Sequence, residues 1–334
     1  MRDILIIQTA FAGDLILTTP LVTETARCFP DAGIDVLCIP TTASLMDGLP
    51  AVRRTIMYDK RGRDPGLPAL MRTLRNGHYD LCLSPHRSLR SAILARSTRA
   101  PVRVAFDRAT GSALYTHRVP YDPAAHEVVR NLRLLEAVGF EPEYEATPSL
   151  HPAEQDYAAA VDVLGERGGR QYLCIAPGSV WATKRWTEEG FAETAKVLAD
   201  RWDIVFVGGP EDSERCARIA AIAGVPAVNT AGKLSLTASA ALIGGASLLI
   251  SNDSAPVHMA SAMGTPVVEI FGATVPEFGF TPYGIPYRIV QREGLSCKPC
   301  AIHGGNACPI QTFECMRDLS PTAVITAARE LLPA

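Results

Sequence analysis

The sequence lacks any apolar run near the ~20 residues that a membrane-spanning helix needs, so no span is predicted. It also lacks a strong excess of one charge: 32 Lys+Arg stand against 35 Asp+Glu, which gives no overall indication of nucleic-acid binding. No secretory signal is predicted, because Gln8 interrupts the first apolar residues and Asp3 and Asp14 flank them. Nine cysteines without such a signal indicate a reducing compartment, so we expect a cytoplasmic protein.

What the chain does contain is a repeated alternation of short apolar runs and amphipathic stretches, typical of doubly wound α/β domains. The expected strands are 4–7, 34–39, 55–58, 79–83, 102–105, 172–176, 204–207, 247–251 and 267–271. The expected helices are 66–76, 88–98, 126–138, 188–201, 211–223, 236–244 and 255–263, and residues 13–29 are expected to form a turn that leads into a helix.

The alternation weakens over residues 107–152, where five prolines fall, and then restarts. With 334 residues and a hydrophobic content of 47%, two globular domains are expected, at 1–152 and 153–334. The carboxyl ends of parallel strands bind ligands in such domains, so we expect a ligand cleft between the two.

Charge is unevenly distributed along the chain. Residues 1–150 carry a net charge of +2 and residues 151–334 a net charge of −5, while residues 51–118 hold 14 basic against 4 acidic side chains. This basic stretch is explained either by a solvated arginine-rich face or by a surface for a phosphorylated acceptor or an anionic membrane.

Small residues follow the first expected strand, in Gln8-Thr-Ala-Phe-Ala-Gly-Asp14. Such a turn lets a ligand approach the backbone and places Asp14 at the start of a helix. Taken by spacing alone, Asp14 is better explained as a helix cap. The motif is not G-x-G-x-x-G, so a dinucleotide-binding fingerprint is not supported.

Two motifs in the second half are suited to phosphate. In Ala176–Trp186, a Gly-Ser turn precedes Lys184, and backbone N–H, hydroxyl and ammonium groups can together hold a phosphate. In Ser251–His258, an Asn-Asp-Ser turn opens a helix, whose N-terminus attracts a diphosphate. Asp253 could accept hydrogen bonds from sugar hydroxyls. Taken alone, His258 is more typical of a core histidine than of a ligand.

An acidic segment and a cysteine segment complete the candidates. Glu211, after a Gly-Gly-Pro turn, suits a ribose diol, although acids at a helix N-terminus explain it equally well.

Four cysteines within 19 residues could form a structural zinc site, with packed free thiols and disulfides as the alternatives. These are Cys297, Cys300, Cys308 and Cys315, with His303 as a substitute ligand. The other five cysteines are interpreted as small buried side chains.

In their order along the chain, these motifs resemble glycosyltransferase family 9, the lipopolysaccharide heptosyltransferases and their relatives. The resemblance rests on GDLILTTPLV, HRSLRSAILA, VRVAF, PGSVWATKRW, VGGPEDSE, GKLSLTASAALIGGASLLISNDSAPVHMASAMGTPVV and the CKPC…CM ending. It implies a GT-B architecture, in which two Rossmann-like doubly wound domains face each other across a cleft. The N-terminal domain would bind the acceptor and the C-terminal domain the sugar nucleotide, with the final helix packing back on the N-terminal domain.

The resemblance also assigns roles. Asp14 matches the proposed general base, and Lys184 stabilises the leaving group. Donor contacts are implied for Ser179, Lys184, Glu211, Asp253, Ser254, Ala255 and His258. It implies inverting transfer of a heptose or related sugar from an ADP-activated donor to a glycan or glycolipid hydroxyl, without a catalytic cofactor. The expected acceptor is lipopolysaccharide core or another surface glycan, with peripheral contact to the anionic inner membrane.

Two other functions fit parts of the pattern. A sugar-nucleotide epimerase or another GT-B enzyme would share the diphosphate turn but would not need Asp14 to face an acceptor. A non-catalytic protein that binds ADP-sugars would need neither Asp14 nor Lys184, and the presence of both residues argues against it.

Overall fold

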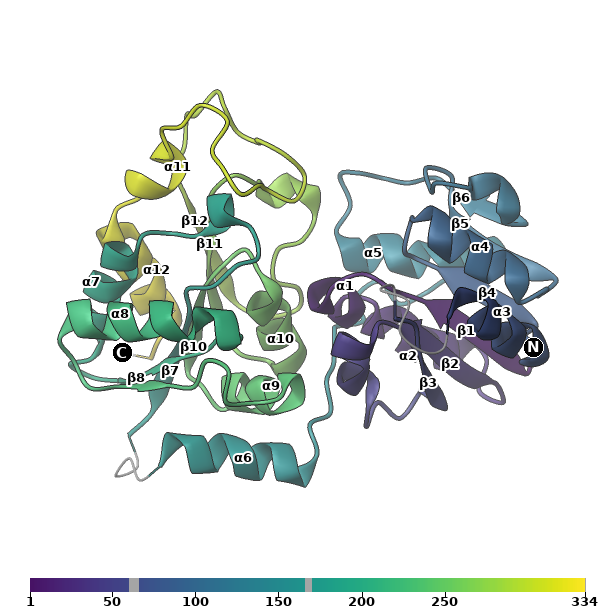
Figure 1. The fold of residues 1–334 in the computed structure, drawn as a ribbon, viewed down its shortest axis with the longest axis horizontal. Helices are drawn as coiled ribbons and strands as arrows, with labels where there is room; N and C mark the ends of the chain where they lie inside the picture. The colour runs from purple at the N-terminus through teal and green to yellow at the C-terminus, as the bar shows by residue number, and fades with distance from the viewer. Residues whose placement is uncertain (60–65, 166–169, 334) are drawn as a thin grey trace. The chain divides into compact units, whose positions relative to one another are not determined.

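The computed structural model describes residues 1–59, 66–165 and 170–333, and the chain divides into two compact units, Met1–His151 and Pro152–Ala334 (Figure 1). This division lies one residue before the boundary expected from the sequence. Each unit is an α/β domain built on one six-stranded sheet in which all neighbouring strands are parallel.

The first unit follows the predicted alternation of strands and helices. Its sheet has the order β3-β2-β1-β4-β5-β6. The strands are β1 (Asp3–Ile7), β2 (Gly33–Cys38), β3 (Arg54–Met57), β4 (Leu81–Ser84), β5 (Val102–Phe106) and β6 (His117–Val119). The helices are α1 (Ala12–Ile16), α2 (Thr19–Cys28), α3 (Leu67–Asn76), α4 (Leu89–Ser97) and α5 (Glu127–Leu132), with 3-10 turns η1 (Pro40–Met46), η2 (Ser112–Leu114) and η3 (Arg133–Val138).

The second unit repeats this plan. Its sheet has the order β12-β11-β10-β7-β8-β9. The strands are β7 (Tyr172–Ala176), β8 (Asp203–Phe206), β9 (Ala227–Asn229), β10 (Leu248–Asn252), β11 (Val267–Phe271) and β12 (Tyr287–Gln291). The helices are α6 (Glu154–Leu164), α7 (Glu188–Leu198), α8 (Ser213–Ala223), α9 (Leu236–Gly244), α10 (Ala255–Met263), α11 (Glu314–Arg317) and α12 (Pro321–Leu331), with 3-10 turns η4 (Ala182–Lys184), η5 (Pro210–Asp212) and η6 (Pro276–Phe278).

The segment 13–29, expected as a turn that leads into a helix, forms two helices, α1 and α2, with a break at Leu17 and Thr18. Pro20 lies in the first turn of α2 and has no N–H to continue a helical hydrogen-bond ladder. The Thr18 hydroxyl donates instead to the carbonyl of Asp14, 2.7 Å away. Asp14 is therefore confined to a helix of five residues.

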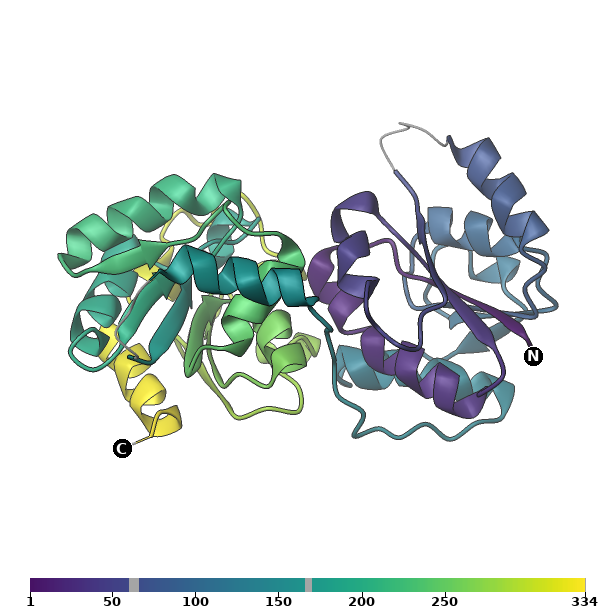
Figure 2. The same cartoon turned by 90° about the horizontal axis from the view of Figure 1, so that it is seen from below.

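The sequence analysis missed the three short strands β6, β9 and β12. Each lies at or near the edge of its sheet and is largely exposed or half-buried, so none carries the apolar run that marks a central strand. The helices α6 and α11 were also missed. The last helix, α12, was expected on the N-terminal domain; its main contacts are with α7, β11 and β12 of its own unit (Figure 2).

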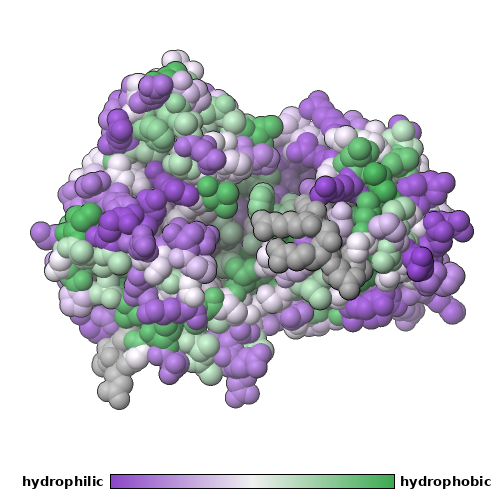
Figure 3. All heavy atoms as spheres, in the orientation of Figure 1, coloured by the Kyte–Doolittle hydropathy of each residue, from purple (hydrophilic) through white to green (hydrophobic). Residues whose placement is uncertain are grey.

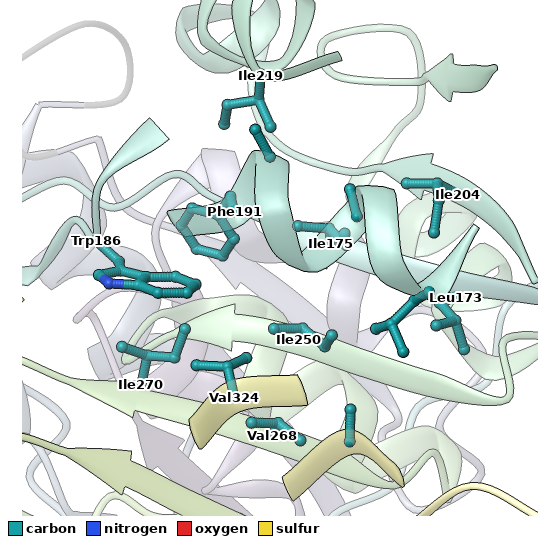
Figure 4. Packing of buried hydrophobic residues seen from close by; sticks show 14 of the residues in the cluster. Leu173, Ile175, Trp186, Phe191, Ile204, Ile219, Ile250, Val268, Ile270 and Val324 are labelled. Carbon is teal, nitrogen blue, oxygen red and sulfur yellow. The ribbon is translucent and has the colours of Figure 1, made fainter. Parts of the chain in front are cut away.

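Alternation along the strands of the second unit builds a core on one face of the sheet. Ile250, Val268 and Ile270 point to this face and pack with Trp186 and Phe191 (Figure 4). Helices α7, α8 and α12 contribute further apolar side chains to this core. The intervening residues of β10 and β11 therefore point to the opposite face, which α10 covers.

Both sheets change direction of strand order at one point, between β1 and β4 in the first unit and between β7 and β10 in the second. Loops at such a switch point diverge and leave room for a ligand at the carboxyl edge of the sheet. These four loops carry most of the candidate residues.

Figure 3 shows hydrophilic residues interspersed over much of the visible face. Across the described ranges, no helix combines the length and apolar character needed to cross a membrane.

Candidate active site

Asp14 lies in the first turn of α1, directly after the loop that follows β1. The N-cap of this helix is Phe11, and no side chain caps it, so the interpretation of Asp14 as the helix cap is wrong. Asp14 is half-buried, and its carboxylate is not the cap of α1.

A polar cluster lies at the same edge of the sheet, between the loops after β1 and β4. The Nδ1 atom of His86 is 2.9 Å from the Thr9 hydroxyl and 2.8 Å from the Ser91 hydroxyl. The hydroxyl of Ser88 caps α4 by accepting from the Ser91 amide at 3.2 Å. Sequence reasoning did not single out Thr9 or His86; their positions just beyond the ends of β1 and β4 were the available signal.

Glu127, at the start of α5, is a second carboxyl near Asp14. Its side chain is buried, and Arg130 donates to it from Nε at 2.7 Å. Burial, together with the nearby charge of Asp14, raises the pKa of Glu127 to about 7, against the opposing charges of Arg130 and Arg87. Asn131 of the same helix donates to the carbonyl of Leu17 at 3.2 Å, which fixes α5 against the turn that follows α1.

Some basic side chains of the stretch 51–118 form contacts within the first unit. Arg53 and Arg54 pair with the fully buried Asp35 at 2.9 and 2.6 Å, and Arg87 stacks over the Tyr121 ring at 4.1 Å. Residues 60–65 of the stretch lie outside the described residues. Other arginines of the stretch are exposed, namely Arg72, Arg75, Arg90, Arg96, Arg99, Arg108 and Arg118.

In the second unit, the structure brings together two predicted residues that are far apart in the sequence. The Lys184 ammonium lies 2.6 Å from Oδ2 of Asp253, and both side chains are largely buried. The Thr274 hydroxyl donates to the same carboxylate oxygen at 2.6 Å. Lys184 ends η4, after β7, and Asp253 follows β10, so the pair stands at the switch point of this sheet.

Asn252 holds the two loops of this switch point in register. Its side-chain amide donates to the Pro177 carbonyl at 2.8 Å, and its Oδ1 accepts from the Trp186 amide at 3.0 Å. Both partners belong to the segment that carries Ser179 and Lys184. Ser179 is half-buried in this loop, and its carbonyl accepts from Arg185 Nε at 2.7 Å.

The remaining donor-site candidates gather at the N-terminus of α10. Ser254 is the N-cap residue, but its hydroxyl bonds the Asn252 carbonyl at 3.2 Å and does not cap the helix. Ala255 is the first helical residue, and His258 is buried one turn further on. No side chain caps this nine-residue helix, so its N-terminus is open to an anion at the Ala255 amide, while Pro256 has no N–H and the Val257 amide donates to the Ser254 carbonyl at 3.1 Å.

Asp212 is adjacent to Glu211 and would be the ribose contact if the loop were shifted by one residue, and the structure distinguishes the two side chains. Asp212 is buried and accepts from the Gly209 amide at 3.1 Å, so it belongs to the turn. Burial, with the charge of Glu211, raises the pKa of Asp212. A Cβ at Gly178 would lie 2.2 Å from the Asp212 carboxylate, so this glycine is required for close packing. Glu211, in contrast, is exposed.

The four C-terminal cysteines are free thiols that lie near one another. Burial and then the other thiols raise the pKa of Cys315 to about 11, and burial followed by Cys297 and Cys308 raises that of Cys300. In the parts of the chain that the structure describes, no three His, Cys, Asp or Glu side chains are arranged to hold a metal ion. The predicted zinc site therefore has proximity in its favour but no ligand geometry.

The cysteine segment contacts the turn that carries Lys184. The Gly305 amide donates to the Thr183 hydroxyl at 2.8 Å, and the Thr183 amide donates to the Gly305 carbonyl at 3.0 Å. A Cβ at Gly304 would stand 3.2 Å from Cγ of Lys184. Interactions that stabilise the cysteine segment therefore also help to position Lys184. This connection could not be predicted from the sequence.

Two six-stranded parallel sheets with the same doubly wound order, each with polar loops at its switch point, define two Rossmann-like domains. The solved structure of a glycosyl transferase family 9 protein from Veillonella parvula has this fold, with a TM-score of 0.85 and 23% identity over 99% of this chain and 97% of that one. The E. coli heptosyltransferase WaaC, solved with ADP-2-deoxy-2-fluoro heptose, matches with a TM-score of 0.70 and 22% identity over 98% and 99% of the two chains. The architecture is thus the GT-B fold of glycosyltransferases.

The family model for glycosyltransferase family 9 (heptosyltransferase) matches residues 67–307. Lipopolysaccharide heptosyltransferase 3 of Escherichia coli is 30% identical over 278 residues, which cover 79% of this chain and 82% of that protein. The chain belongs to glycosyltransferase family 9 and is a glycosyltransferase. This confirms the family and the fold expected from the sequence motifs.

Proposed function

We propose that this enzyme transfers a heptose, with inversion, from an ADP-activated donor to a hydroxyl of a lipopolysaccharide core or another surface glycan. The observation that carries the proposal is the buried Lys184–Asp253 pair beside the N-terminus of α10. An ammonium and a helix N-terminus together provide positive potential for a diphosphate, and a carboxylate beside them can accept from sugar hydroxyls. The WaaC structure, solved with an ADP-heptose analogue, supports the choice of donor.

In the proposed reaction, the acceptor oxygen attacks the anomeric carbon on the face opposite the diphosphate. The new C–O bond forms as the bond between the anomeric carbon and the diphosphate oxygen breaks. Asp14 takes the proton from the attacking hydroxyl, since a carboxylate that does not cap its helix can serve as general base. Lys184 and the N-terminus of α10 stabilise the charge that develops on the leaving ADP. Ser179 and Glu211 are proposed as further donor contacts, and no step requires a metal ion.

We assign the acceptor to the first unit and the sugar nucleotide to the second. Exposed arginines of the stretch 51–118 would meet the anionic groups of a lipid-linked acceptor or of the inner membrane surface. The enzyme would then act at the cytoplasmic face of that membrane.

The test is a product assay with the purified chain, ADP-heptose and a panel of core-oligosaccharide acceptors. We expect ADP release only when an acceptor is present, and a product heavier than the acceptor by one heptose in mass spectrometry. Conversion of the donor sugar without an acceptor would instead identify an epimerase. Tight binding of ADP-heptose without turnover on any acceptor would identify a non-catalytic binding protein.

A further inference from the structure

Glu269, in the middle of β11, has a fully buried carboxyl group. Neither of its oxygens has a hydrogen-bond partner among the described residues. A buried polar group without a partner is costly, and such a group in a native protein calls for an explanation. Val268 and Ile270 beside it belong to the apolar core, so Glu269 points to the opposite face, which α10 covers.

The surroundings of Glu269 belong to the donor site. Glu269 pairs in register with Ser251 of β10, and the amide of Asp253 continues this ladder by donating to the Ile270 carbonyl at 3.1 Å. Asp253 is thus two residues beyond the residue of β10 that pairs with Glu269. The long Glu269 side chain can reach a neighbour at this diagonal position. Among the described residues, Asp253 and Lys184 act on the Glu269 carboxyl through their charges, and α10 carries the buried titratable residue His258.

Burial and the negative charge of Asp253 both raise the pKa of Glu269, against the opposing charge of Lys184. A fully buried carboxyl group without a hydrogen-bond partner favours its neutral form, which has one O–H donor. In the structure, the positive partner of Asp253 is Lys184, at 2.6 Å. If the Lys184 ammonium turned toward a bound diphosphate, Asp253 would keep the Thr274 hydroxyl but lose its positive partner.

We propose that Glu269 is a positioning residue of the donor site, whose O–H donates to Asp253 when Lys184 engages the diphosphate of the sugar nucleotide. This inference rests on the proposed function. The hydrogen bond from Glu269 would hold the Asp253 carboxylate in place without a net positive charge. The exchange needs no proton transfer, because the neutral acid keeps its proton throughout.

Two variants of Glu269 separate this role from a structural one. Glu269→Leu removes an unpaired buried acid, so its thermal midpoint should equal or exceed that of the wild type. Its affinity for ADP, measured by calorimetry, should fall by about tenfold, the loss expected for one hydrogen bond to a charged group. Glu269→Gln keeps a neutral donor and should bind ADP within about twofold of the wild type, near the usual error of such comparisons. Unchanged ADP affinity in Glu269→Leu, or an equal loss in both variants with lowered thermal midpoints, would overturn the proposal.

A double-mutant cycle tests whether Glu269 acts through Asp253. In an Asp253→Asn background, Glu269→Leu should cause no further loss of ADP affinity, whereas additive losses would contradict the proposal. Infrared spectroscopy supplies a readout that does not depend on turnover. The wild-type spectrum at neutral pH should contain a protonated-carboxyl band, separate from the contribution of Glu127, that is lost in the difference spectrum of Glu269→Gln and that shifts when ADP binds. Wild-type protein that shows this band but fails to bind ADP would refute the proposed donor, while absence of the band refutes the role of Glu269.

Discussion

Replacing Lys184 by methionine isolates the contribution of one charge to donor binding. Methionine keeps most of the apolar stem, which packs near Gly304, and removes the ammonium that lies 2.6 Å from Asp253. Two effects follow from this single change. The donor diphosphate loses a charge-assisted hydrogen bond, and Asp253 loses its positive partner but keeps the hydroxyl of Thr274.

The magnitudes of the two effects differ and can be measured separately. A hydrogen bond to a charged group contributes about 1.5–3 kcal/mol, so the affinity for ADP should fall roughly 10- to 150-fold. Breaking a fully buried ion pair costs roughly 3–5 kcal/mol. The side chains of Lys184 and Asp253 are 13% and 9% exposed, so the loss of folding free energy should lie below that range, at about 1–3 kcal/mol.

Calorimetric titration with ADP and urea denaturation measure the two losses. Lys233→Met is the matched control, since Lys233 is an exposed lysine of the same unit. Adenosine serves as a second control, because it lacks the diphosphate and its affinity should be the same for Lys184→Met and for the wild type. A folded Lys184→Met protein that binds ADP as well as the wild type would place Lys184 outside the donor site and refute this reasoning.

Further predictions concern both units. Asp14→Asn should lower kcat by at least ~100-fold with unchanged ADP affinity. The exposed control Asp47→Asn should leave kcat unchanged. Near-normal turnover of Asp14→Asn would show that Asp14 has no catalytic role. Because the folded protein holds Glu127 at a pKa of about 7 against 4.5 when exposed, it binds extra protons between these values, and stability falls as pH rises through this window. The stability of the wild type relative to Glu127→Gln should therefore drop by roughly 3 kcal/mol from pH 4 to pH 8, and a pH-independent difference would contradict the assignment. Binding to anionic vesicles should weaken steeply with salt if residues 51–118 form the contact, and salt-independent binding would exclude it. Elemental analysis should find about one zinc per chain if residues 297–315 form a metal site; absence of metal with four titratable thiols would remove the hypothesis.

Most of the secondary structure could be predicted because its signals are local. Central strands such as β7 and β11 are short apolar runs between turn residues, and their predicted bounds agree with the structure. The family could also be recognised from the chain, because its motifs follow the carboxyl ends of these strands in order. Asp14, Lys184 and Asp253 were singled out for that reason, since parallel strands bring such loops to one edge of a sheet.

Tertiary structure decided what depends on contacts between distant segments. The break at Leu17 depends on a proline and a hydroxyl bond, and edge strands such as β9 are defined by their neighbours and carry no apolar pattern of their own. No pattern shows that Glu127 lies beside Asp14 or that the cysteine segment holds the turn of Lys184. Likewise, the sequence around Glu269 does not predict which side chains surround a glutamate within an apolar strand. Only the pairing of β10 with β11 places Glu269 against Asp253, because register and burial are properties of the assembled sheet.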